Sequence, residues 1–173
     1  MRSPRLRNTT GGFTLIELLL YVALIGIFLS VLAFFFASSA SMRVKNQAED
    51  DVNQQAAFVM NLMTQTIRNA DGITTPTANN SAASATLTVP TAANSPTIFQ
   101  LSGSTLQIKE GSTAAITITS PSVQISNLTF TNTTRTSTPG SLQISFTLSA
   151  TANSTQDEFN YSRTFTSSAS LRP

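Results

Sequence analysis

Cysteine, histidine and tryptophan are all absent from this chain of 173 residues. Without cysteine the chain can form neither a disulfide nor a thiolate metal site. Histidine and cysteine are the usual bases and nucleophiles of enzymes, and no glycine-rich phosphate loop is present either. We therefore expect no enzymatic activity and no cofactor.

Acidic residues are too few for an obvious metal site. The adjacent pair Asp157 and Glu158 could bind Ca²⁺ together with backbone carbonyls. Two acids in a turn are usually just solvated, so we predict no metal.

Charge of either sign is scarce. Charged residues make up 10% of the chain, against about 25% in an average globular protein. Three arginines, Arg2, Arg5 and Arg7, lie in the first twelve residues, and the rest of the chain has seven basic and eight acidic side chains. No basic patch remains for a nucleic acid, so we predict no such partner.

One long apolar run stands out near the N-terminus. Between residues 13 and 37 the only ionisable side chains are Glu17 and Tyr21, and a helix of that length spans a bilayer core of about 30 Å. An acid inside such a helix costs up to about 3 kcal/mol on insertion scales and usually persists because it has a partner. The position of Glu17 therefore needs an explanation.

A partner for Glu17 would arise if a peptidase cut the chain between Gly12 and Phe13. The cut creates a cationic α-amine one helical turn before Glu17. The amine of one subunit could then neutralise Glu17 of the next, because a charge pair in a medium of low dielectric attracts strongly and is costly to leave broken. Such pairing favours staggered stacking of helices and thus polymerisation.

The run GGFTLIELLL at residues 11–20 resembles the prepilin cleavage and methylation signature of type IV pilins, type II secretion pseudopilins and competence pseudopilins. Residues 1–12 resemble the short basic leader of that family. The resemblance implies that Gly12 precedes the scissile bond, that Phe13 becomes the methylated N-terminus, and that Glu17 serves alignment and assembly. It also implies four partners: a prepilin peptidase and methylase, other pilin or pseudopilin subunits, an inner-membrane assembly platform, and membrane lipid.

Two departures from the family pattern favour a minor pilin or minor pseudopilin that primes a filament. Many type IV pilins close a C-terminal loop with a disulfide, which this chain cannot form. Many also have a proline roughly twenty residues into the mature helix, where this chain has Phe34. We expect a minor or priming subunit of a type IV pilus or pseudopilus.

Three other interpretations remain at this point. A secretory signal peptide has a basic start too, and residues 38–40 (Ser-Ser-Ala) could serve as its cleavage site, but the apolar core here is longer than the usual 7–15 residues. A plain membrane anchor does not explain the register of Glu17 with Gly12. A membrane-anchored surface adhesin that never polymerises is the third.

Orientation follows from the basic residues that precede the span. They predict a cytoplasmic N-terminus and a single pass through the inner membrane, with everything after residue 37 outside. A filament built from such subunits would be extracellular or periplasmic.

The remaining chain predicts an amphipathic helix and then strands. Apolar residues recur at steps of three and four from Val44 to Ile67, and Gly72 could provide a left-handed cap near Asp71. We assign residues 1–12 to a leader that is removed, 13–37 to the transmembrane half of one helix, 38–72 to its amphipathic half, 73–97 to a flexible Thr/Ser/Asn/Ala loop, and 98–173 to an antiparallel sheet.

Alternation of apolar and polar residues predicts the strands after residue 98. Tight turns are expected at Ser102-Gly103-Ser104 and Glu110-Gly111-Ser112, and a bulge at Ser126-Asn127, where the alternation slips. The segment from Phe165 to Arg172 reads as a polar ending after the last strand. The predicted fold class is therefore α+β, a long N-terminal helix packed on a C-terminal antiparallel meander, as in pilin-like proteins.

Overall fold

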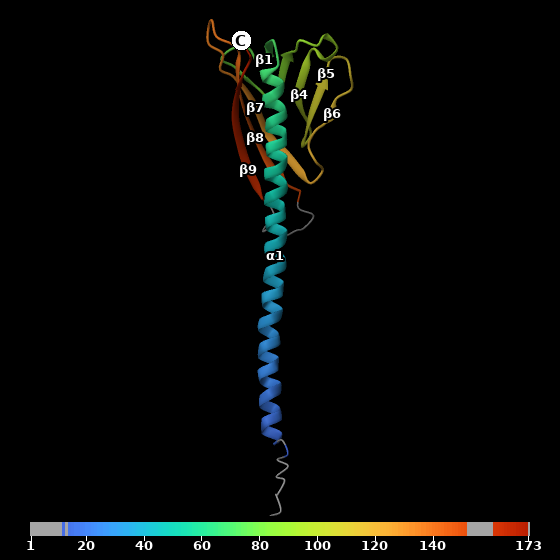
Figure 1. The fold of residues 1–173 in the computed structure, drawn as a ribbon, viewed down its shortest axis with the longest axis vertical. Helices are drawn as coiled ribbons and strands as arrows, with labels where there is room; N and C mark the ends of the chain where they lie inside the picture. The colour runs from blue at the N-terminus through green and yellow to red at the C-terminus, as the bar shows by residue number, and fades with distance from the viewer. Residues whose placement is uncertain (1–11, 13, 152–160, 173) are drawn as a thin grey trace, which may run out of the picture. The chain divides into compact units, whose positions relative to one another are not determined.

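A computed structural model describes residues 12, 14–151 and 161–172 (Figure 1). It confirms the α+β class, with one long N-terminal helix followed by antiparallel sheets. The chain divides into two compact units, Met1–Arg43 and Val44–Pro173. The second unit contains the sheets and the core.

Helix α1 runs unbroken from Leu15 to Arg68 over 54 residues. The sequence prediction extended this helix to residue 72 and assigned a left-handed cap to Gly72. That cap is wrong, because Gly72 has no positive φ and begins strand β1. The last turn is closed instead by the N–H groups of Asn69 and Ala70, which donate to Gln65 O at 3.0 Å and Ile67 O at 3.2 Å.

The apolar stripe predicted on the second half of the helix forms one wall of the core. Its members from residue 52 onward are buried at helical spacing: Val52, Ala56, Val59, Met63 and Ile67. The stripe contacts buried side chains of both sheets in one hydrophobic cluster. Small and medium residues on this face let the helix lie close to the strands.

Two antiparallel sheets replace the single predicted meander. The larger has the order β1-β3-β4-β5-β6, with β1 (Gly72–Thr75), β3 (Ala85–Thr88), β4 (Thr97–Ser102), β5 (Thr105–Glu110) and β6 (Ile116–Thr117). The smaller has the order β2-β7-β8-β9, with β2 (Ser81–Ala82), β7 (Val123–Asn132), β8 (Ser141–Ala150) and β9 (Ser162–Ser170). Alternation along each strand predicted strands but not this partition, because the sheet that a strand joins depends on partners far away in the chain.

Two other segment assignments are also wrong. Residues 73–97 were predicted as a loop with one short strand candidate at residues 86–89, which overlaps β3. The segment also contains most of β1, all of β2, and a 3₁₀ turn at Ala92–Asn94. Ala85 and Leu87 are buried in the core, and their burial stabilises β3. The segment from Phe165 onward is polar, but it does not follow the last strand, because β9 continues to Ser170 and pairs with β8 along its whole length. Within β9 only Ala169 is buried.

The predicted turns and the bulge are confirmed. Gly103 and Gly111 have φ values of 62° and 55°, which favour glycine. A Cβ on Gly111 would also overlap with the carbonyl oxygen of Ala93, so the close backbone approach there excludes any side chain. The register between β7 and β8 shifts after Ser126, where Asn127 has a φ of 53°. Asn tolerates this left-handed conformation better than most residues.

Phe146→Ala is expected to destabilise the second unit by about 3–5 kcal/mol, because loss of this fully buried ring of β8 leaves a cavity in the hydrophobic core. The ring also lies 5.9 Å from that of Phe165. Denaturant unfolding of the full chain in detergent, followed by circular dichroism, measures the change. Phe58→Ala removes a ring that is 54% exposed on the same unit, and we expect it to cost less than about 1 kcal/mol. Equal losses for the two variants would contradict the packing described here.

Candidate functional site

Gly12 precedes the helix and is exposed, whereas Phe13 lies outside the described residues. No described atom lies within 4 Å of the position that a Cβ on Gly12 would occupy. The φ of Gly12 is outside the left-handed region as well. Neither packing nor backbone conformation therefore requires glycine at this position.

Thr14 is the N-cap of α1. The N–H groups of Glu17 and Leu18 donate to Thr14 O at 3.1 and 3.2 Å, and the Glu17 N–H also lies 3.4 Å from Thr14 Oγ1. Thr14-Leu15-Ile16-Glu17 fits the Thr-x-x-Glu spacing of a capping box, a sequence signal that the helix prediction did not use. The cap fixes where the helix starts and so places Glu17 in its first turn.

Glu17 is half-buried on this turn, and its carboxylate accepts a hydrogen bond. Tyr21, one turn later, donates its hydroxyl to Glu17 Oε1 at 3.2 Å. The first turn of a helix also favours a carboxylate, because its N–H groups point outward. Sequence reasoning noted Tyr21 only as an ionisable group and missed this contact, although a spacing of four residues on a helix signals it.

The residues after Glu17 form an apolar span. One helix segment among the described residues, Leu15–Ser39, is long and apolar enough to cross a membrane, and none of it is buried within the protein. Its large side chains are exposed along every face, including Phe34 at 78%. Such a surface needs lipid or other helices around it.

Residues 7–33 match a known family, the prokaryotic N-terminal methylation motif. The chain has a prepilin-type N-terminus. This N-terminus is that of type IV pilins and pseudopilins, and it implies processing by a prepilin peptidase and assembly with other pilins. Its single apolar helix fits single-pass membrane anchoring. Neither a comparison with curated proteins nor one with solved structures found a match.

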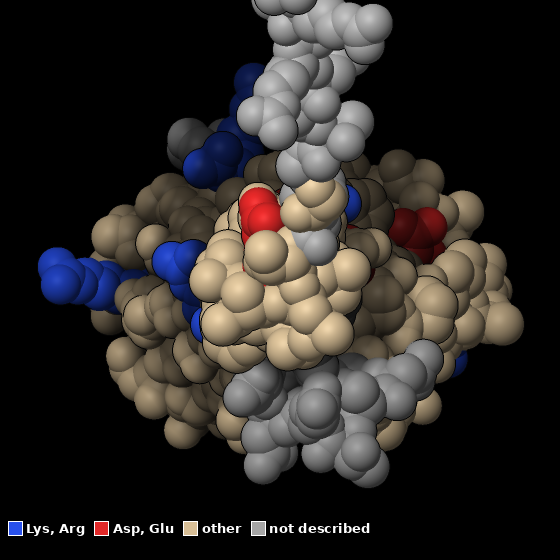
Figure 2. Space-filling view, turned by 90° about the horizontal axis from the view of Figure 1, so that it is seen from below, with Lys and Arg blue, Asp and Glu red and all other residues tan. Residues whose placement is uncertain are grey.

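The prepilin-type N-terminus belongs to structural subunits rather than to enzymes. Within residues 12, 14–151 and 161–172, no group of three or more acids could hold a metal ion. The pair Asp157 and Glu158, considered above for Ca²⁺, lies outside these residues. Seen along the helix in Figure 2, the surface is mostly uncharged, in line with the 10% charged composition.

Proposed function

We propose that the chain is a prepilin that is cleaved between Gly12 and Phe13, methylated at the Phe13 amine, and assembled through α1 into a type IV pilus or pseudopilus. One observation carries this proposal. Glu17 is the sole acid on an exposed apolar span, four residues after Phe13 and within the matched motif.

The proposed chemistry joins these groups. Hydrolysis of the Gly12–Phe13 amide releases the leader and frees the Phe13 amine, which is cationic at neutral pH. A carboxylate on the first helical turn of a neighbouring subunit is a suitable partner for this amine. The pair removes two isolated charges from a lipid-like environment, and each would be costly alone.

We also propose a minor or priming role. Support comes from the absence of cysteine and from the uninterrupted helix, which has Phe34 where many major pilins have a kinking proline. The leader arginines support a cytoplasmic N-terminus, with the second unit outside and the filament extracellular or periplasmic. The inner-membrane assembly platform and the surrounding lipid are the remaining partners of this proposal.

The first experiment is intact-mass and N-terminal peptide analysis of membrane and sheared-filament fractions from native cells. A chain that begins at N-methylated Phe13 and occurs in the sheared fraction is expected. A mature chain that stays wholly in the membrane would favour the non-polymerising surface adhesin instead. A chain that retains residues 1–12, or begins near Ser41, would contradict the prepilin assignment and leave an anchored or secreted domain.

We expect Tyr21→Phe to leave processing intact and to lower recovery in sheared filaments by about fivefold. The substitution removes the hydroxyl that holds the Glu17 carboxylate, and one such bond is worth about 1 kcal/mol. Ser30→Ala is the matched control, because it removes a hydroxyl bonded at 2.8 Å to Gly26 O on the same span. Equal recovery of the two variants would show that Tyr21 does not position Glu17.

A further inference from the structure

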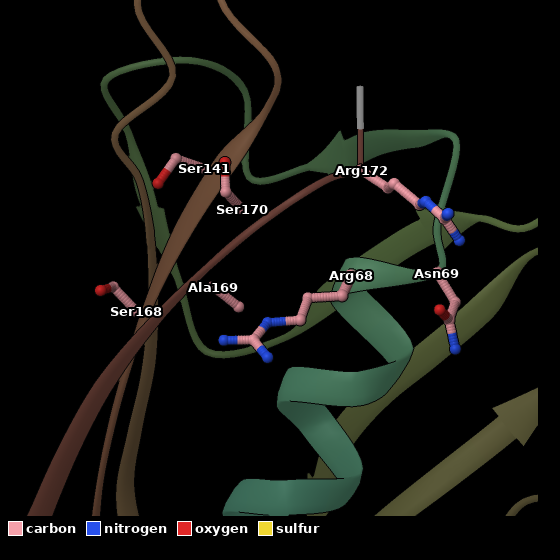
Figure 3. Close-up of a pocket in the computed structure, with 7 residues that line it drawn as sticks. All are labelled: Arg68, Asn69, Ser141, Ser168, Ala169, Ser170 and Arg172. Carbon is pink, nitrogen blue, oxygen red and sulfur yellow. The ribbon is translucent and has the colours of Figure 1, made fainter.

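A basic pocket lies where the end of α1 meets the end of β9 (Figure 3). Its volume is about 540 Å³, and all but one of the described residues that line it, Ala169, are polar or charged: Arg68, Arg172, Asn69, Ser141, Ser168 and Ser170. Arg68 comes from the last turn of α1, and Arg172 from the segment after β9. The fold thus brings together two cations that are far apart in sequence.

Both cations lack a counter-charge in the described part of the chain. No Asp or Glu is among the described residues that line the pocket, and neither guanidinium has a hydrogen bond or ion pair to any described residue. Arg163, on the same strand β9, differs. It donates to Asn53 Oδ1 at 3.4 Å and lies 5.4 Å above the Phe165 ring.

The two side chains point to different sides of the pocket. Their backbones are tied, because the Arg172 N–H donates to Arg68 O at 3.2 Å. From this junction the Arg68 guanidinium extends toward Ala169 and Ser168, whereas that of Arg172 extends toward Asn69 (Figure 3). A single carboxylate held by one of them would leave the other unpaired.

The position of Arg68 at the C-terminus of α1 explains why one cation is found there, but it does not explain the presence of two. A cation in the last turn is favoured by the helix dipole, which accounts for Arg68 alone. Three carbonyls of that turn already accept backbone hydrogen bonds: Gln65, Ile67 and Arg68. Their lone pairs are therefore partly used, and the guanidinium groups keep their donors for a ligand.

We propose that this pocket receives an acidic segment, with at least two carboxylates, from a neighbouring pilin-type subunit. Guanidinium groups bind carboxylates through paired N–H donors, and the serine hydroxyls can donate as well. The proposal rests on the proposed function, since assembly into a filament supplies the neighbour. In a chain with so few charges, this pocket gives the second unit a specific contact in addition to helix packing.

A zero-length carbodiimide cross-linker tests the contact, because it joins an amine to a carboxylate only where the two touch. The chain has two lysines, Lys45 and Lys109, which are first changed to arginine. Arg68→Lys or Arg172→Lys then adds one reactive amine to the pocket without changing its charge. Arg163→Lys is the matched control on β9.

Filaments sheared from cells that produce each lysine variant are treated with the carbodiimide, and the cross-linked peptides are identified by mass spectrometry. We expect the lysine at 68 or 172 to link to an Asp or Glu of a pilin-type subunit at least about tenfold more than the lysine at 163. Independently, Arg68→Glu combined with Arg172→Glu should lower recovery in filaments at least about fivefold, and Arg163→Glu should not.

The outcomes separate the two proposals. The docking proposal is overturned if the mature chain is in the sheared fraction but the new lysines cross-link no more than Arg163→Lys and charge reversal does not lower recovery in filaments. The prepilin function would still stand. A link to a protein outside the filament overturns it too. Absence of mature chain from the sheared fraction overturns the filament function, and the docking proposal with it.

Discussion

A full-length chain with Gly12→Ser is expected to accumulate as an uncut precursor that retains residues 1–12. The folded protein offers no reason for this loss, since no described atom lies within 4 Å of the added Cβ. The cost must therefore arise in the peptidase, whose site would have to accommodate a side chain beside the scissile bond. We expect processing to fall at least about tenfold, measured as the ratio of mature to precursor mass in the membrane fraction.

A control separates cleavage from stability. Gly26→Ala also changes a glycine with open space around its Cβ position, but it lies on the span, where alanine is the better helix former. Gly26→Ala should be processed at the normal rate. Normal maturation of Gly12→Ser would instead place the cut elsewhere and remove the basis for methylation at Phe13.

Glu17→Ala is expected to be cleaved normally and then largely excluded from filaments. Without the carboxylate, the Phe13 amine of a neighbouring subunit has no partner in an apolar environment, and a charge left unpaired in this way costs about 3–5 kcal/mol. Recovery in the sheared fraction should fall at least about tenfold, while the mature mass in the membrane stays unchanged. Normal recovery would exclude an assembly role for Glu17.

Glu17→Gln separates charge from hydrogen bonding. Glutamine keeps the size of the side chain and an oxygen that can accept from the Tyr21 hydroxyl. If the negative charge drives assembly, Glu17→Gln behaves like Glu17→Ala. Recovery close to that of the unchanged chain would show that the contact with Tyr21, rather than neutralisation of an amine, is what assembly requires.

Local patterns in the sequence predicted much of the fold. The burial of Val52, Val59 and Ile67 follows directly from helical spacing, because one face of a helix must meet the core. The bulge after Ser126 follows from a slip in alternation. The two-sheet division did not follow, since β2 pairs with β7 through residues 50 apart, such as Ser81 and Thr131.

The candidate site shows the same contrast between local and distant information. Gly12 and Glu17 can be recognised in the sequence because each differs from its neighbours. Gly12 lies at the junction between the basic leader and the apolar run, and Glu17 is an acid within that run. The hydrogen bond from Tyr21 to Glu17 was missed, because a tyrosine is not unusual on an apolar span and the sequence does not show where its hydroxyl lies. No sequence pattern unites Arg68 with Arg172, which only the course of β9 brings together.

The packing of α1 against the sheets has a mechanical consequence. Val52, Val59, Met63 and Ile67 are spread along several turns of the helix, and each is fully buried. A force that pulls the N-terminal end of α1 along the helix axis would act on all of these contacts at the same time. The helix would have to slide past the strands, because the contacts would not separate one by one. Resistance to shear then adds up over the whole interface. The sheets of the second unit are thus held to α1 by contacts that must all slip at once for the helix to be pulled out along its axis.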